Sequence, residues 1–453
     1  MAVLSAALAP NAAADDVRSQ QWYLTAMKAD EMWKVSTGKG VKVAVVDSGV
    51  NAGTSSLKGQ VLVDEVPKAV SYHVTQDFVG HGTTMAELIA GTGAGGGLKG
   101  LAPGAKIVPY RIALDGLKDP VEKRNTPSTA KVIRAAADTD AKIISMSFGT
   151  PYFDPDVEAA IKYARSKGKL MFASVGNEAE KKNSIGYPAA YPFVVGVAAA
   201  DKTGKVGKFS EHGNYVDLAA PGLGVATWCD ATFKSYCPGE GTSMATAITS
   251  ASAALVWSAH PEWTANQVLG SLIDTAGRDW PKNNPSNYLG YGLIRPRKVL
   301  ENTGIDPGPA KTDPLSYENE TGVTDASPPP PRQLRHTPEN QYWQPDFGGR
   351  IKRGVVRRGH PVGGSRGRRG RAGDRGRRLR GAPFTAPRLT TPARPDPRDV
   401  CPRKTNHNPR KGVRTWPTAA SSTTTGYRNS RRTSWTGTSP SRSNSPPSRG
   451  RST

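Results

Sequence analysis

The sequence predicts an α/β fold in which helices cover both faces of a mainly parallel β-sheet. Two observations carry this prediction. Short runs rich in valine, isoleucine and alanine alternate with helical patterns along the chain, and these runs are continuously apolar instead of alternating with polar residues. Both features are typical of parallel strands that are buried on each face. The expected strands lie at 41–46, 105–112, 141–147, 169–175 and 193–199.

The segments between and after these strands carry helix signals. Helical patterns lie at 83–90, 128–137, 155–166, 243–259 and 264–275. Asp154 before Pro155 gives the third of them a capping residue followed by a residue suited to the first helical position. Thr264 and Gln267 have the spacing of a capping box at the start of the last helix. We therefore place the folded domain at residues 41–305.

The positive charge of the chain lies in its C-terminal part. Residues 331–453 hold 29 Lys and Arg against 5 Asp and Glu, whereas residues 1–330 hold 32 against 33, although the whole chain has a net charge of +23. The domain itself therefore offers no basic excess for nucleic acid. The tail at 332–453 has too few large apolar residues to offset chain entropy, so we expect it to be disordered, after a proline-rich acidic linker at 306–331.

Two interpretations of this basic tail stay open. It is either a genuine segment or an out-of-frame translation of GC-rich coding DNA. A genuine tail would give the chain a second function to consider, the binding of nucleic acid or another polyanion with an affinity that falls steeply with salt. No aromatic residues are interleaved with the arginines in a way that supports specific contacts to nucleic acid.

The N-terminus indicates export. An apolar run at 2–9 and an Ala-x-Ala sequence that ends at Ala14 resemble the end of a secretory signal peptide, although a basic start is missing. Residues 15–40 then form an N-terminal arm. No later stretch approaches the length of a membrane-spanning helix, and we expect a secreted or cell-envelope-associated protein.

The cysteines fit an oxidising compartment. Cys229 and Cys237 are eight residues apart in a loop-like stretch, and Cys401 lies in the tail. A disulfide between the first two is favoured, with two unpaired thiols as the alternative because spacing alone does not establish a bridge. The acidic residues show no metal-ligand spacing, so we assign no metal and no cofactor, and structural calcium stays unsupported.

Three segments hold the residue types that nucleophilic catalysis requires. Asp47 ends a buried strand in VAVVDSG, His81 lies between glycines in GHGTTMA, and Ser243 opens a long helix in GEGTSMAT. A serine hydroxyl needs a base to accept its proton and an acid to orient that base. Each residue alone also has a structural explanation, as a turn aspartate, a structural histidine and a capping serine.

Taken together and in this order, the three segments resemble the subtilisin-like serine peptidases over about residues 41–276. The resemblance implies a three-layer sandwich fold and a serine endopeptidase that acts through an acyl-enzyme with Asp47, His81 and Ser243 as its triad. It also implies that Asn177 in ASVGNEA supplies an amide to the oxyanion, where the alternative is a simple turn asparagine.

The same resemblance implies the position of the substrate. Ser147, Phe148 and Gly149 would form one edge of the cleft, and Gly186 would lie at the floor of the primary specificity pocket. A glycine there leaves room, so we expect sizeable apolar side chains to be accepted before the cleaved bond.

The chain resembles the mycosins of type VII secretion more closely still. The supporting segments are VRSQQWYLTAMKADEMWKVSTGKGVKVAVVDSGV, GGGLKGLAPGAKIVPYR and ASAALVWSAHPEWTANQVL. This likeness implies a monomer that cleaves peptide or protein substrates and works with secretion-system components. The chain departs from the family pattern in three ways. Thr246-Ala247 stands where many relatives have Ala-Pro, and the N-terminal arm is too short for a folded inhibitory propeptide. The sequence given also has no membrane helix after the linker.

Overall fold

The structure, a computed structural model, describes residues 17–316 and residue 319. The expected signal segment at 1–14, the basic tail at 332–453 and most of the linker at 306–331 lie outside the described residues, as does Cys401.

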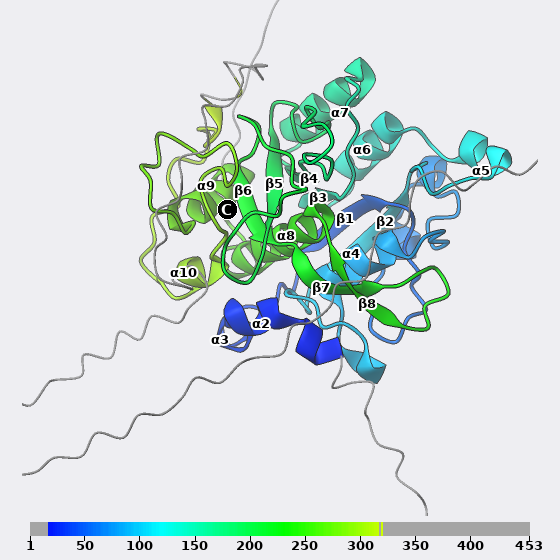
Figure 1. The fold of residues 1–453 in the computed structure, drawn as a ribbon, viewed down its shortest axis with the longest axis horizontal. Helices are drawn as coiled ribbons and strands as arrows, with labels where there is room; N and C mark the ends of the chain where they lie inside the picture. Colours follow the sequence, from blue (N-terminus) through cyan, green and yellow to red (C-terminus); the bar gives the residue numbers. More distant parts are fainter. Residues whose placement is uncertain (1–16, 317–318, 320–453) are drawn as a thin grey trace, which may run out of the picture. The chain divides into compact units, whose positions relative to one another are not determined.

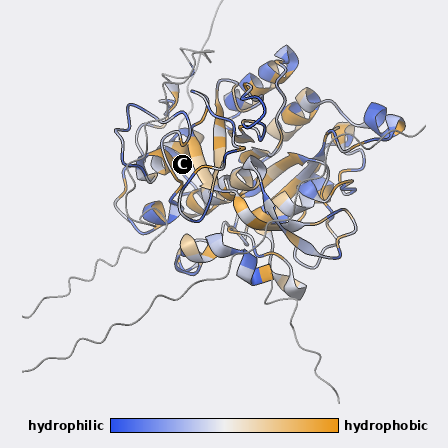
Figure 2. Ribbon diagram, viewed as in Figure 1, coloured by the Kyte–Doolittle hydropathy of each residue, from blue (hydrophilic) through white to orange (hydrophobic). Residues whose placement is uncertain are grey.

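A six-stranded parallel sheet forms the centre of the described part, with the strand order β2-β1-β3-β4-β5-β6 (Figure 1). Its strands are β1 Lys42–Asp47, β2 Lys106–Arg111, β3 Ile143–Met146, β4 Leu170–Ser174, β5 Val194–Ala200 and β6 Leu218–Pro221. Apart from the lysines that open β1 and β2, every strand residue is buried. Figure 2 shows the corresponding hydrophobic colour along the centre of the fold. The predicted parallel sheet is therefore confirmed.

Helices flank this sheet in pairs. The five expected ones are α4 His81–Ala90, α6 Thr129–Ala137, α7 Pro155–Ser166, α8 Thr242–Ala259 and α9 Ala265–Thr275. Helix α6 packs against α7, and α4 packs against α8, which also contacts most strands of the sheet (Figure 1). The side chain of Asp154 caps α7, and Thr264 and Gln267 form the expected capping box at α9. Each helix lies within two residues of its predicted bounds.

Helix α8 is buried from Thr242 to Trp257. Alanine, serine and threonine dominate its first three turns, and such small side chains let a helix lie close to a sheet. The hydroxyls inside it are satisfied locally, since Thr246, Thr249 and Ser252 each donate to the carbonyl four residues earlier. A buried helix can therefore present its first turn at a fixed place on the sheet.

Several short elements were not predicted from the sequence. They are α2 Trp22–Ala26, α3 Ala29–Trp33, η1 Val63–Glu65, η2 Lys68–Val70, η3 Ala94–Gly96, α5 Pro120–Asn125 and α10 Pro296–Leu300. The strand β6 was missed too, because four residues with small side chains that end in proline carry no clear β signal.

Part of the N-terminal arm belongs to the folded unit. Tyr23 is fully buried, and the Trp22 indole donates to the Leu223 carbonyl at 3.0 Å. The Trp33 indole donates to the Leu101 carbonyl at 2.8 Å. Indole and phenol rings bury a large apolar area while their polar atom finds a partner. The arm is thus anchored to the loop that follows α4 and to the first residue of β7.

A disulfide-closed hairpin lies against α4. Its antiparallel strands are β7 Leu223–Trp228 and β8 Tyr236–Glu240, and Cys229 and Cys237 are joined with their Cα atoms 5.1 Å apart. The Trp228 and Tyr236 rings stack with centroids 3.8 Å apart. The Tyr236 hydroxyl donates to Glu87 of α4 at 2.8 Å, so the hairpin is tied to the helix that begins at His81.

Substitution of Glu87 should change how stability depends on pH. Glu87 is fully buried, and burial raises the pKa of its carboxyl to about 7 against hydrogen bonds from Thr54 and Tyr236 that lower it. Between about pH 4.5 and 7 the folded chain therefore keeps a proton on Glu87 that the unfolded chain has released. The stabilisation that the protonated carboxyl gives to the fold is complete below about pH 4.5 and is lost as the pH rises through about 7.

We predict that the effect of Glu87→Gln on the free energy of unfolding depends on pH. At pH 8 the substitution should be more stabilising than at pH 4 by about 3 kcal/mol. Urea unfolding at pH 4, 6 and 8 measures this, with the exposed Glu180→Gln as the control. Parallel pH curves for the wild type and Glu87→Gln would contradict the prediction.

Candidate active site

Asp47 and His81 meet where the first strand ends and the first long helix begins. Asp47 is the last residue of β1, and His81 is the first residue of α4. The imidazole Nδ1 donates to Asp47 Oδ1 at 2.7 Å. The same oxygen accepts from the backbone N–H and the hydroxyl of Ser48, at 2.7 and 3.1 Å. A fully buried carboxylate thus orients a partly exposed imidazole.

The glycine after His81 allows this approach. A Cβ at Gly82 would collide with the Gly49 carbonyl oxygen and would lie 3.0 Å from the Asp47 Cβ. Only a residue without a side chain lets the start of α4 come so near to the end of β1. The glycines of the GHG motif therefore serve the pairing of Asp47 with His81.

A second buried carboxylate, Asp77, supports the pair from behind. Its Oδ1 accepts from the Ser48 hydroxyl at 2.8 Å and from the backbone N–H groups of Val79 and Gly80 at 3.1 and 2.8 Å. Its Oδ2 accepts from the N–H and hydroxyl of Thr83, at 2.8 and 2.6 Å. Asp77 thus fixes the turn before His81 and the Ser48 hydroxyl. Our sequence analysis missed it, although an acid just ahead of a helix start was a usable signal.

The charges of these acids act on the titration of His81. Burial lowers the pKa of the imidazole, but the charge and hydrogen bond of Asp47, together with the charge of Asp77, outweigh it. The net result is a pKa above the ordinary 6.5. The raised pKa means that this imidazole accepts a proton more readily than an ordinary histidine does.

Ser243 lies in the first turn of α8, after Thr242. Its hydroxyl donates to the Ser147 carbonyl at 3.0 Å, and the Ser147 hydroxyl donates back to the Ser243 carbonyl at 3.2 Å. Within residues 17–316, no hydrogen bond joins Ser243 to His81. The structure therefore forms the contact between acid and base, and places the serine on the helix that packs against α4.

Asn177 contacts the same helix start. Its side-chain oxygen accepts from the N–H and the hydroxyl of Thr242, both at 2.9 Å. The side-chain nitrogen is left to donate elsewhere, and a Cβ at Gly241 would lie 3.6 Å from it and 3.8 Å from the Ser243 nitrogen. Amides in the first turn of a helix have no acceptor within the helix. Two donors thus lie near one point beside Ser243.

The other predicted site residues lie in the chain segments that follow β3 and β4. The two strands pair last at Met146 and Ala173. Beyond that point Thr150 pairs with Tyr187, with both backbone hydrogen bonds at 2.8 Å. Gly149 is exposed, and a Cβ there would lie 3.7 Å from the Ser174 carbonyl oxygen, whereas Gly186 is buried and Phe148 is half-buried. These segments lie at the carboxyl ends of parallel strands, where α/β folds bind ligands.

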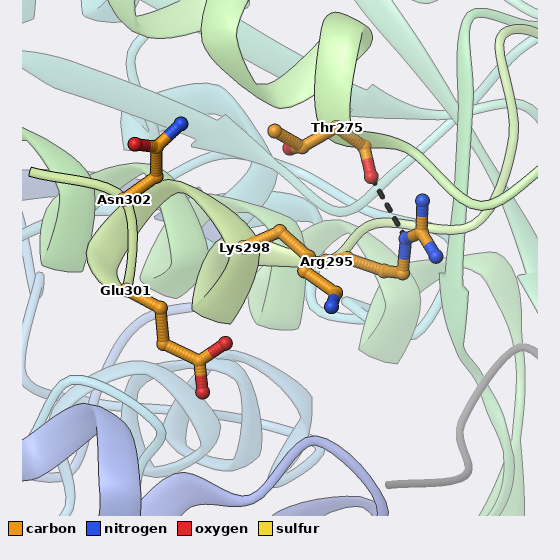
Figure 3. A pocket seen from close by; sticks show the side chains of 5 residues that line it. All are labelled: Thr275, Arg295, Lys298, Glu301 and Asn302. Carbon is orange, nitrogen blue, oxygen red and sulfur yellow. Dashed lines mark hydrogen bonds between the residues drawn. The ribbon is translucent and has the colours of Figure 1, made fainter. Parts of the chain in front are cut away.

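A separate polar pocket lies on α9 and α10, lined by Thr275, Arg295, Lys298, Glu301 and Asn302 (Figure 3). The Arg295 guanidinium donates there to the Thr275 carbonyl at 2.8 Å. None of the predicted site residues lines it.

In the described part of the chain, no group of three or more His, Cys, Asp or Glu side chains is placed to hold a metal ion. No helix among these residues is long and apolar enough to cross a membrane.

Comparison with known families identifies this arrangement. Residues 38–292 match the model described as the subtilase family, peptidase S8. The chain belongs to the subtilase family. It is 32% identical to subtilisin E of Bacillus subtilis over 261 residues, which cover 57% of this chain and 65% of that protein. It is 33% identical to subtilisin BL of Lederbergia lenta, of which it covers 90%. The chain thus spans slightly less than two thirds of subtilisin E.

Solved structures of mycosins are also similar to this subtilase. The MycP3 protease from the type VII (ESX-3) secretion system is 28% identical, with a TM-score of 0.52, and the match covers 61% of this chain and 87% of that one. MycP1 from Mycobacterium smegmatis is 26% identical, with a TM-score of 0.52 and coverages of 64% and 86%. These matches confirm the predicted subtilisin-like fold and the resemblance to mycosins.

The support that Asp77 gives to His81 is measurable without any substrate. We predict that Asp77→Asn lowers the pKa of the His81 imidazole, because one of the two negative charges that raise it is removed. NMR titration of the imidazole C–H resonances measures the pKa, with the exposed Asp115→Asn as the control. An unchanged His81 pKa in a folded Asp77→Asn protein would be the opposing result.

Proposed function

We propose that this subtilase is a serine endopeptidase whose triad is Asp47, His81 and Ser243. The observation that carries the proposal is the 2.7 Å hydrogen bond between the buried Asp47 carboxylate and the His81 imidazole, on a helix that packs against the one bearing Ser243. Membership of the subtilase family supports the same assignment. The substrate class is a peptide or protein chain.

The proposed reaction begins with a rotation of the Ser243 hydroxyl. In the free protein it donates to the Ser147 carbonyl, and a turn about the Cα–Cβ bond releases it toward the helix α4 side. Hydrogen bonds between catalytic groups often become short only when a substrate is bound. His81 then accepts the hydroxyl proton while Oγ attacks the peptide carbonyl carbon.

The later steps reuse the same groups. Asp47 stays ionised and stabilises the imidazolium, which next gives its proton to the departing amine nitrogen. An acyl-enzyme on Ser243 is left, and a water molecule activated by His81 hydrolyses it by the reverse proton transfers. The raised pKa of His81 favours its uptake of a proton, first from the Ser243 hydroxyl and later from the hydrolytic water.

The negative charge on the carbonyl oxygen needs donors that are already in place. Asn177 is oriented by its oxygen, which accepts twice from Thr242, so its N–H group is available to the oxyanion together with the Ser243 N–H. The backbone that runs from the buried Ser147 to the exposed Gly149 would pair with the substrate as an added strand.

The biological setting follows from the relatives. The structures named as MycP3 and MycP1 include proteases of type VII secretion systems, and their likeness to this chain supports a role in processing proteins at the cell envelope. Secretion-system components are then its proposed partners. The alternative of polyanion binding depends on the arginine-rich tail, which lies outside the described residues, and no observation in the described part favours it.

A covalent probe tests the nucleophile directly. We predict that a fluorophosphonate labels Ser243 of the folded protein, that Ser243→Ala abolishes labelling, and that Asp47→Asn slows it by orders of magnitude because the imidazole is no longer oriented. Peptide mass mapping identifies the labelled residue. Folded wild-type protein without an adduct on Ser243 would refute the proposed triad.

The oxyanion donor is tested separately. We predict that Asn177→Ala lowers kcat by about 10²–10³-fold, the loss known for removal of such a donor from a subtilisin, with a smaller change in KM. Steady-state hydrolysis of an internally quenched peptide gives both constants. The control is Asn183→Ala, in an exposed loop asparagine that contacts His212. Equal kcat values for the wild type and Asn177→Ala would remove Asn177 from the mechanism.

A further inference from the structure

Glu211 is a buried acid next to the segment that carries Asn177. Its side chain and backbone are only 5% exposed. The Glu211 N–H donates to the Gly176 carbonyl at 3.0 Å, and the Ala179 N–H donates to the Phe209 carbonyl at 3.1 Å. These two bonds hold the turn segment 209–211 against the loop 176–179. Glu211 is therefore fixed relative to the oxyanion donor without touching the triad.

The carboxylate of Glu211 lies beside two glycines, one of which, Gly176, directly precedes Asn177. A Cβ at Gly176 would collide with Glu211 Oε2, and a Cβ at Gly186 would lie 3.3 Å from the same oxygen. Gly186 also approaches the Val175 carbonyl so closely that a Cβ would collide with it. The absence of a side chain at 176 thus makes room for the Glu211 carboxylate next to the residue that carries the proposed oxyanion donor.

No basic side chain neutralises this acid. Among the ion pairs formed by residues 17–316, none involves Glu211. A buried carboxylate without a countercharge is costly, and such groups are retained mainly where they act on a ligand. The missing positive charge is what a cationic side chain of a substrate would supply.

The titration of Glu211 agrees with this placement. Burial raises the pKa of its carboxyl to about 7, the charge of Glu178 adds to the rise, and the backbone N–H groups of Glu178 and Ser184 oppose it. Tyr215 is the other titratable neighbour, and the Glu211 charge raises the pKa of its phenol in turn. The Tyr215 hydroxyl is held by the Ser184 carbonyl at 3.0 Å. The carboxyl is hence charged only above about pH 7.

We propose that Glu211 is the specificity-determining residue of this peptidase and that it selects lysine or arginine immediately before the cleaved bond. In this proposal the side chain at that position extends from the attacked carbonyl past Gly176, and the cationic end of its aliphatic stem pairs with the Glu211 carboxylate. This replaces the expectation of an apolar preference, which considered Gly186 alone. The proposal rests on the proposed peptidase function.

A set of internally quenched peptides tests it. The peptides differ only at the residue before the cut, which is lysine, arginine, norleucine, glutamine or phenylalanine. Norleucine matches the lysine stem without its charge. We expect kcat/KM for lysine to exceed that for norleucine by about tenfold or more at pH 8.5. We expect this ratio to fall as the pH decreases through about 7, because the carboxyl is then protonated.

The variant Glu211→Gln should lose the preference at pH 8.5 while still cleaving the norleucine peptide. Glu180→Gln, an exposed acid near the same loop, is the matched control and should keep the wild-type ratio. Fluorophosphonate labelling of each variant confirms that its nucleophile is intact. If Glu211→Gln does not fold, the pH dependence of the wild-type lysine to norleucine ratio provides the same test.

A wild-type preference for norleucine or phenylalanine over lysine at pH 8.5 would overturn the proposal, and so would an unchanged ratio in Glu211→Gln. These outcomes differ from a failure of the peptidase function, in which folded wild-type protein neither reacts with the fluorophosphonate nor cleaves any of the peptides.

Discussion

The proposed active site depends on one buried carboxylate at the end of a buried strand. Asp47 is fully enclosed, and a single one of its oxygens accepts from His81, from the Ser48 backbone and from the Ser48 hydroxyl. Three donors at one oxygen offset part of the solvation that burial removes from the charge, while the other oxygen, Oδ2, is buried without a hydrogen-bond partner among the described residues. The imidazole is then held by an interaction that the rest of the fold stabilises. The sheet fixes the position of Asp47, and the start of α4 must lie close enough for His81 to form its hydrogen bond with Asp47.

Glycines and other small residues allow the close approach of backbone segments that this contact requires. Gly82 lets α4 approach β1, and the small side chains of α8 let its first turn lie at the ends of β3 and β4. Glycine lowers the stability of the folded chain through its entropy when unfolded, so glycine suits positions where a backbone must come close to another group. Gly82 of the GHG motif and the small residues of α8 therefore meet geometric requirements of the site.

The sequence was sufficient for the parts whose signals are local. The apolar runs predicted five strands and the helical patterns predicted five helices, two of them with a capping signal, because burial on two faces and helix ends both leave a short-range mark. The motifs around Asp47, His81, Asn177 and Ser243 combine a reactive residue with the turn that presents it. The hairpin β7–β8 left no such mark, since its residues are mostly half-exposed and its stability comes from a disulfide and from contacts with α4.

Asp77 and Glu211 were missed for a related reason. Nothing near Glu211 in the sequence indicates that residues 176 and 186 converge on its carboxylate, because only the pairing of segment 209–211 with the loop after β4 brings them together. Apolar periodicity cannot reveal a buried acid, and the structural environment decides whether that acid is compensated.

Asp47 and Glu211 both carry the desolvation cost of a buried carboxylate, but this cost has a different consequence for each. Asp47 receives its compensating donors from within the chain, so its charge is available to orient an imidazole before any substrate arrives. Glu211 receives no basic partner from the described residues, and its pKa is raised to about 7 by burial. A carboxylate in that condition gains more from an incoming cation than a solvated one would, because the cation restores interactions that burial removed. The same desolvation that makes Glu211 a poor contributor to stability would therefore make it, in the role we propose, a strong discriminator between charged and neutral side chains.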